Sequence, residues 1–255
     1  MSLRIIRQTL ACAAALAASF GLSVAGQAQT RFEGWSSVVI AGDWRDGDGK
    51  PIEAFDNARH DLSEAVVRAG LPRSLHRSIT LNPAKADAVE PAEALKQMGE
   101  TLSEGSRGCF FYMTSHGLPG EIVFGDTKGL APVDLAVMLR RWCEAKPTVI
   151  VLSSCYSGSF VDALKAPNRM ILTAARRDRS SFGCGEGEQY PWFDACVLES
   201  LPSADDFLGL AQAARTCVAR READAEIDTP SEPQLFIGSE MQFRLPVLRF
   251  SRLSG

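Results

Sequence analysis

Residues 147–158 read PTVIVLSSCYSG, and this stretch decides the fold class. Its first seven residues form the most strongly β-branched run in the chain, without the polar alternation of a half-exposed strand. Such a run predicts a strand that is covered on both faces, as strands of parallel sheets are. The run ends at a thiol, Cys155, and a turn containing Gly158 follows. The sequence therefore places a reactive group directly after a buried strand.

Apolar runs alternate with helical patterns along the rest of the chain. Further strands are expected at residues 35–41, 74–81, 108–114, 169–174 and 234–237. Helices are expected at residues 55–69, 91–104, 132–145, 192–201 and 205–222, a small hairpin at 121–130, and polar loops at 43–51 and 176–190. This alternation predicts βαβ units, and so an α/β fold with a mostly parallel central sheet flanked by helices.

The composition is that of a globular protein. The chain has 255 residues, of which 45% are hydrophobic and 23% are charged. These proportions exclude a disordered chain, a collagen and a multispanning membrane protein. The net charge is −4 and no run is rich in Lys or Arg, so a nucleic-acid partner is not expected.

The first 28 residues have the pattern of a secretory signal peptide. Arg4 and Arg7 precede an apolar run at residues 10–24, and Gly26-Gln27-Ala28 provides a small-x-small cleavage site. The alternatives are an uncleaved membrane anchor, for which this run is shorter than the ~20 residues a span needs, and a lipoprotein anchored through Cys12. We expect residues 29–255 to form one exported domain, secreted or periplasmic, without membrane contact after cleavage.

Two polar residues follow predicted strands at the positions where parallel sheets bind ligands. Cys155 follows the strand at 147–153, and His116 follows the strand at 108–114. Adjacent strands lie ~4.8 Å apart, so the two side chains could meet and act as nucleophile and base. The backbone N–H groups of Gly117 and Cys155 could then bind an oxyanion. The competing interpretation is a packed core cysteine and a surface histidine.

The remaining cysteines of the mature chain have no readable pairing. Cys109 and Cys143 are expected to face the core, either as buried thiols or as a disulfide. Cys184 lies in the polar loop, and Cys196 and Cys217 lie on late helices. With Cys155 free, five cysteines remain, so at least one more must be unpaired.

Several segments in the same order resemble the legumain-type cysteine peptidases, the asparaginyl endopeptidases of the caspase-like fold. The similarity extends from about Val38 to Gly238. The segments that carry it are DNARHD (56–61), FYMTSHG (111–117), VIVLSSCYSG (149–158), RSSFGCG (179–185) and SEPQ (231–234). The resemblance implies a three-layer caspase-like domain.

The resemblance also implies roles for individual residues. Cys155 would be the nucleophile and His116 the general base and then acid. Asn57 matches the asparagine that orients the catalytic histidine in legumains. Arg59 matches the arginine of the pocket for the residue before the scissile bond, and His60 is its neighbour there.

Further pocket residues follow from the same resemblance. Ser180 or Ser181 matches a serine of the pocket wall, and Asp194 matches its second acid, although at a different spacing. Legumains carry a glutamate two residues before the nucleophile, where this chain has Ser153. Without that acid, a pocket containing Arg59 is expected to accept Asp at least as well as Asn.

The expected function is a cysteine endopeptidase that cleaves peptides or proteins after Asn or Asp through an acyl-enzyme, without a metal or other cofactor. A related transamidase or transpeptidase would use the same acyl-enzyme with an amine acceptor. A non-catalytic caspase-like binding module is the other alternative, but such modules usually lack one member of the Cys–His dyad. The three histidines, His60, His76 and His116, lack the spacing of zinc ligands.

Overall fold

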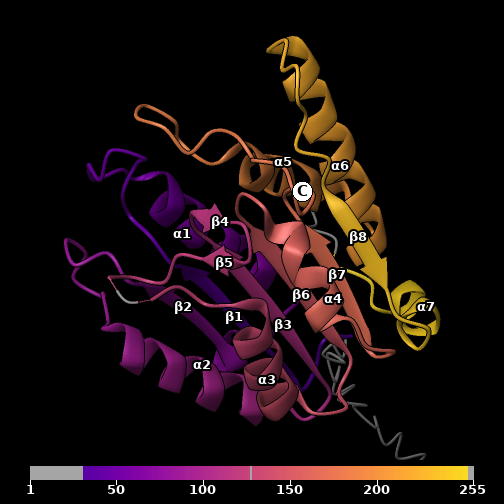
Figure 1. The fold of residues 1–255 in the computed structure, drawn as a ribbon. Coiled ribbons are helices and arrows are strands. Elements are labelled where there is room, and N and C mark those ends of the chain that lie inside the picture. The colour runs from indigo at the N-terminus through magenta and orange to yellow at the C-terminus, as the bar shows by residue number, and fades with distance from the viewer. Residues whose placement is uncertain (1–30, 127, 252–255) are drawn as a thin grey trace, which may run out of the picture.

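The computed structural model describes residues 31–126 and 128–251, so the predicted signal peptide lies outside the described residues. A six-stranded sheet forms the centre, in the order β2-β1-β3-β6-β7-β8 (Figure 1). The strands are β1 (Trp35–Ala41), β2 (His76–Thr80), β3 (Gly108–Thr114), β6 (Thr148–Ser153), β7 (Arg169–Thr173) and β8 (Gln234–Ile237). Only β8 runs antiparallel to its neighbour, so the sheet is mostly parallel, as the sequence predicts.

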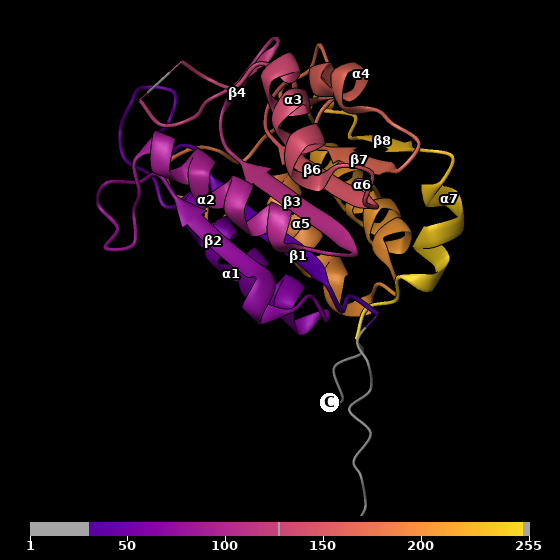
Figure 2. The same cartoon turned by 90° about the horizontal axis from the view of Figure 1, so that it is seen from below.

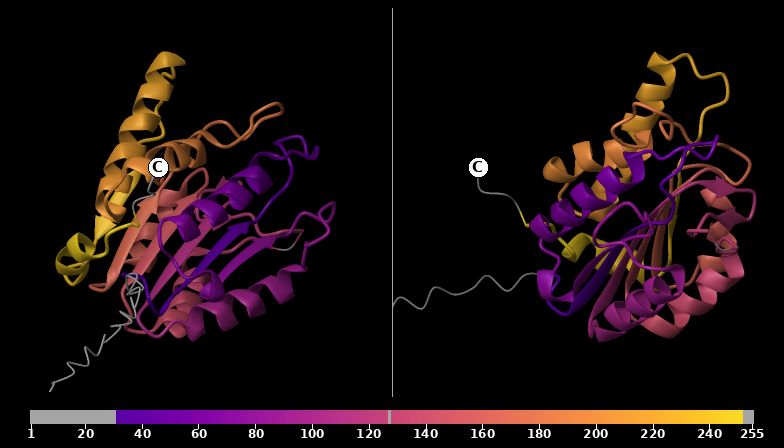
Figure 3. Two further views of the ribbon diagram at one scale, coloured as in Figure 1. Left: turned by 180° about the vertical axis from the view of Figure 1, so that it is seen from behind. Right: turned by 90° about the vertical axis from the view of Figure 1, so that its left-hand side faces the viewer.

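Helices cover both faces of this sheet, which gives three layers (Figures 2 and 3). One layer contains α1 (Ala54–Arg68), α5 (Trp192–Ser200) and α6 (Phe207–Asp224), and the other contains α2 (Pro91–Glu104), α3 (Pro132–Cys143) and α4 (Val161–Leu164). A short helix, α7 (Met241–Arg244), follows β8. The predicted α/β class and the flanked central sheet are confirmed.

The unbroken apolar runs follow from this layering. Along β3, Phe110 and Tyr112 pack into the core beneath α1, α5 and α6, whereas Phe111 and Met113 pack into the core beneath α2 and α3. All seven residues of β3 are buried. Because successive side chains point to opposite faces of a sheet, a strand covered on both sides needs apolar residues at every position.

The small hairpin lies closer to His116 in the chain than the sequence predicts. The hairpin expected at residues 121–130 instead pairs β4 (Gly117–Leu118) with β5 (Glu121–Ile122). Gly120 has a φ of +79°, a conformation that favours glycine, and so provides the turn at this place. Only a single bridge, between Ile122 and Leu130, remains of the predicted pairing.

Two disulfides reinforce the helical layers. Cys109 of β3 is bonded to Cys143 of α3, and Cys196 of α5 is bonded to Cys217 of α6. Among the described cysteines, Cys155 and Cys184 are free. No helix within residues 31–126 and 128–251 has both the length and the apolar character required to cross a membrane.

Candidate active site

The register of two central strands brings His116 and Cys155 to the same edge of the sheet. Thr114, the last residue of β3, pairs with Ser153, the last residue of β6, and the two candidate residues each follow two positions later. Both are half-buried. They therefore lie at equivalent positions beyond adjacent strand ends, as predicted.

Gly117 holds the two strand-end loops in contact. A Cβ atom at this position would lie 2.2 Å from the carbonyl oxygen of Cys155 and 3.0 Å from the Cβ of Ser154. Only glycine lets the backbones approach this closely. Gly117 and Cys155 are consequently backbone neighbours.

The imidazole of His116 is oriented by a backbone carbonyl and an aromatic ring. Its Nε2 lies 2.8 Å from the carbonyl oxygen of Arg45, so Nε2–H donates to that oxygen. The ring packs edge-to-face on Phe55 of α1, with 5.0 Å between ring centroids. A neutral imidazole that donates through Nε2 keeps Nδ1 as its basic nitrogen.

The loop that carries Arg45 is held in place by its own side chain. The guanidinium group of Arg45 donates to Asp43 at 2.8 Å, to Asp126 at 2.5 Å and to the carbonyl of Gly125 at 3.0 Å. It also lies over the ring of Trp44. The sequence predicts only a solvated turn at residues 43–51, because a backbone carbonyl that orients a histidine has no signature in residue type.

The thiol of Cys155 is held by the loop at residues 176–190. The backbone N–H of Ser181 donates to its Sγ at 3.3 Å, and the Ser181 hydroxyl lies 3.6 Å from the same sulfur. The next residue, Tyr156, has a φ of +57°; its N–H donates to Arg179, and its phenol accepts from the Ser180 hydroxyl. Of the two predicted serines, Ser181 therefore contacts the Cys155 thiol, whereas Ser180 contacts the neighbouring Tyr156.

A buried acid lies beneath the two strand ends. Asp194 of α5 is fully buried and accepts hydrogen bonds from the Tyr112 hydroxyl at 2.5 Å, from the Thr114 hydroxyl at 2.6 Å, and from Ser153. Burial raises the pKa of Asp194 to about 6, although these hydrogen bonds oppose the shift. Ser153, two residues before Cys155, is thus joined to the carboxylate of Asp194.

The structure does not bring Asn57, Arg59 and His60 to His116 and Cys155. Asn57 donates to the carbonyl of Gln189 at 3.2 Å, not to the His116 ring. Arg59 is buried, donates to Ser78 at 2.7 Å, and is paired with Asp56 at 3.2 Å. His60 is exposed and lies beside Asp61.

The helix explains these positions. In α1, Phe55 is the residue that meets His116, and each further turn moves the chain 5.4 Å along the helix axis. Arg59 lies one such turn beyond Phe55; it reaches Ser78 of β2 and also bonds to Asp56 of its own helix. A match of residue types in sequence does not show which turn of the helix lies next to the candidate active site.

The second free thiol lies close to the first. Cys184 packs against the apolar cluster that contains Phe55, the residue in contact with His116. Burial raises the pKa of the Cys184 thiol, and the neighbouring Cys155 adds to the shift. Within the described residues, the one group with metal-ligand spacing is Cys196, Glu199 and Cys217, and its two sulfurs form a disulfide.

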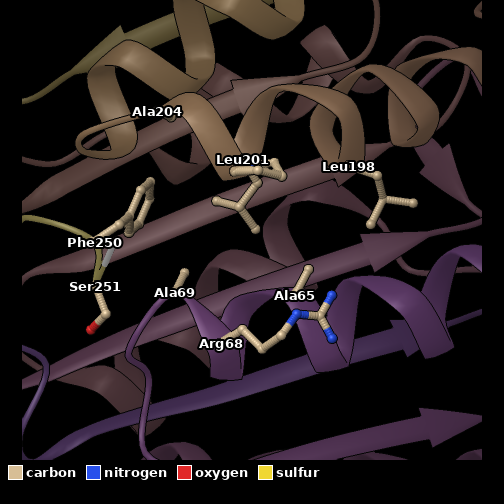
Figure 4. Close-up of a pocket in the computed structure, with 9 residues that line it drawn as sticks. Ala65, Arg68, Ala69, Leu198, Leu201, Ala204, Phe250 and Ser251 are labelled. Carbon is tan, nitrogen blue, oxygen red and sulfur yellow. The ribbon is translucent and has the colours of Figure 1, made fainter. Parts of the chain in front are cut away.

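A cavity of about 110 Å³ between α1 and α5 is separate from this site (Figure 4). Ala65, Ala69, Leu198 and Leu201 give it a mostly apolar wall. Neither His116 nor Cys155 lines it. We therefore take the strand-end edge, where His116 and Cys155 lie beyond the paired ends of β3 and β6, as the candidate active site.

Part of the chain matches a known protein family, and the fold matches a solved structure. Residues 91–204, which include His116 and Cys155, match the model of the peptidase C13 family, the legumain family. The fold is similar to the crystal structure of caspase-1 from Spodoptera frugiperda, with a TM-score of 0.58 and 15% sequence identity over 80% of this chain and 86% of that chain. The search of curated proteins finds no match. The two matches confirm the resemblance to legumain-type, caspase-like cysteine peptidases.

Proposed function

We propose that this protein is an endopeptidase with a Cys155–His116 dyad. The legumain-family match over residues 91–204 and the caspase-like fold support a cysteine peptidase of the caspase and legumain clan. The observation that carries the proposal is the position of the two residues at equivalent places beyond paired strand ends. The carbonyl of Arg45 and the N–H of Ser181 add the orientation that a dyad needs.

The proposed reaction passes through one acyl-enzyme, and His116 carries a proton in each half of it. Nδ1 of His116 accepts the proton of the Cys155 thiol, and the sulfur attacks the peptide carbonyl. The N–H groups of Gly117 and Cys155 hold the oxyanion. His116 returns its proton to the departing amine, which leaves an acyl-enzyme. Water, deprotonated by His116, then releases the peptide acid and restores the thiol.

We further propose cleavage after Asn and Asp, with a preference that depends on pH. Arg59 is already paired with Asp56, so it gives a substrate carboxylate no advantage. Asp194, with a pKa of about 6, is mostly ionised at pH 7 and mostly protonated at pH 5. The ionised acid repels an Asp side chain and polarises Ser153 toward an amide. We therefore expect preference for Asn at pH 7 and better acceptance of Asp at pH 5, which replaces the preference that the sequence alone suggested.

The nucleophile is tested by covalent labelling. A peptide acyloxymethyl ketone that ends in Asn should modify Cys155, and peptide mapping should identify the adduct. Cys155→Ala should abolish both labelling and peptide hydrolysis, whereas Cys184→Ala, the matched free thiol, should keep both. Labelling that persists in Cys155→Ala would refute the proposed dyad.

The selectivity is tested separately with paired substrates. Two peptides that differ only in Asn or Asp are compared by kcat/KM at pH 5 and pH 7, in wild type and in Asp194→Asn. Wild type should change its Asn/Asp ratio with pH more than the variant, because the variant has no carboxyl group to titrate at this position. Equal pH dependence in both proteins would contradict the role of Asp194 and leave the dyad untouched.

A further inference from the structure

A pocket lined by three arginines lies at the opposite edge of the sheet from His116 and Cys155. It has a volume of about 320 Å³ and is lined by Arg31, Trp35, Arg107, Pro147, Arg244, Val247 and Leu248. Trp35 begins β1, and Arg107 and Pro147 stand just before β3 and β6, so the pocket opens at the amino-terminal ends of the strands. We call it the arginine pocket.

The charge of the arginine pocket is uncompensated. No carboxylate lines it, and in the described part of the chain Arg31, Arg107 and Arg244 form no ion pair. The one printed partner of Arg31 is the carbonyl of Val247, at 3.3 Å. Three arginines line this one pocket, in a protein with a net charge of −4. A bound anion would compensate their charge, and guanidinium groups match phosphate and carboxylate geometry.

Apolar surface adjoins the arginines. Phe243 and Val247, on α7 and the turn after it, are 82% and 60% exposed, while Met241, Leu245 and Leu248 of the same segment pack into the core. Large apolar side chains beside arginines are the combination that binds the interface of an anionic lipid bilayer, where the rings and methyl groups enter and the cations meet phosphate. A small soluble anion would not need the exposed Phe243.

The position in the fold is consistent with a membrane surface. Figure 1 shows α7 at the end of the sheet opposite to the tip of β4, which follows His116. A bilayer against α7 would therefore leave the strand-end edge facing water.

We propose that the arginine pocket binds the phosphate of an anionic phospholipid and that Phe243 and Val247 enter the same leaflet. This peripheral contact would hold the folded domain on a membrane surface with the candidate active site turned outward. It departs from the expectation from sequence, which was that the exported domain makes no membrane contact after cleavage. The proposal does not depend on the peptidase activity.

The test measures vesicle binding of the exported protein at low salt. Vesicles of phosphatidylglycerol and phosphatidylcholine are compared with vesicles of phosphatidylcholine alone, by co-sedimentation. The double variant Arg107→Ala, Arg244→Ala should bind anionic vesicles roughly 30-fold more weakly, about fivefold for each charge. The control Arg77→Ala, Arg220→Ala removes the same charge from exposed arginines that do not line the pocket and should bind within a few-fold of wild type.

A second variant separates insertion from charge. Phe243→Ser, which changes no charge, should also weaken binding, and circular dichroism melting shows that every variant is folded. Equal binding to the two vesicle types, or equal losses in the pocket and control variants, would overturn the proposal. Binding of inorganic phosphate in calorimetry without any binding of anionic vesicles would overturn the lipid as ligand.

Discussion

Replacing Gly117 with alanine should separate the two halves of the candidate active site. The new Cβ would lie 2.2 Å from the carbonyl oxygen of Cys155, whereas ordinary van der Waals contact begins at 3.4 Å. The carbonyl or the Gly117 backbone must therefore move by about 1.2 Å, and either movement changes where the nucleophile stands relative to His116. The other two close atoms belong to Ser154, which is buried, so the added methyl group has no free space beside it.

The displacement sets the expected loss of activity. A misplacement of about 1 Å in a catalytic arrangement costs on the order of 100-fold in rate. We expect kcat to fall by roughly this factor, with a smaller change in KM, because the residues around Ser181 are not displaced directly. Overpacking should also lower the free energy of unfolding by about 1–3 kcal/mol.

The assay is steady-state hydrolysis of a fluorogenic peptide that ends in Asn, together with a thermal melt. Gly185→Ala is the matched control, because no atom lies within 4 Å of its added Cβ, and Gly185 lies in the same loop as Ser181. The control should behave as wild type. If Gly117→Ala hydrolysed the peptide at the wild-type rate while folded, the close approach of the two loops would have no catalytic role.

Three further outcomes follow from the structure. Burial raises the pKa of Asp194 from 3.8 to about 6. The stability that the protonated group contributes is therefore fully present below pH 4 and is lost as the pH rises through 6. The melting temperature of wild type relative to Asp194→Asn should accordingly fall between pH 4 and pH 7. Replacing Cys196 and Cys217 together with alanine should lower the free energy of unfolding by about 2–4 kcal/mol in chemical denaturation, whereas Cys184→Ala should not. The exported protein should begin near Gln29 by N-terminal sequencing, and an intact Met1 on a membrane-bound species would favour the anchor.

The sequence predicts the sheet and the placement of His116 and Cys155 beyond two strand ends because both depend on local patterns. Unbroken apolar runs fix β3 and β6, and a reactive residue after each run fixes His116 and Cys155. The surroundings of the dyad depend instead on backbone position and helix register. The carbonyl of Arg45 could have been any residue's carbonyl, and the hydroxyls that meet Asp194 come from strands far apart in sequence.

The pairing of β3 with β6 determines when activity can appear during folding. The two strands are parallel, so the chain must cross over through α3 and close a long loop before Thr114 meets Ser153. Intermediates without this pairing hold the imidazole and the thiol on unconnected segments and cannot hydrolyse peptides. The rate at which turnover recovers after dilution from denaturant would therefore report the rate at which this non-local strand pair forms. A newly synthesised chain would be unable to cleave other proteins until that pair has formed.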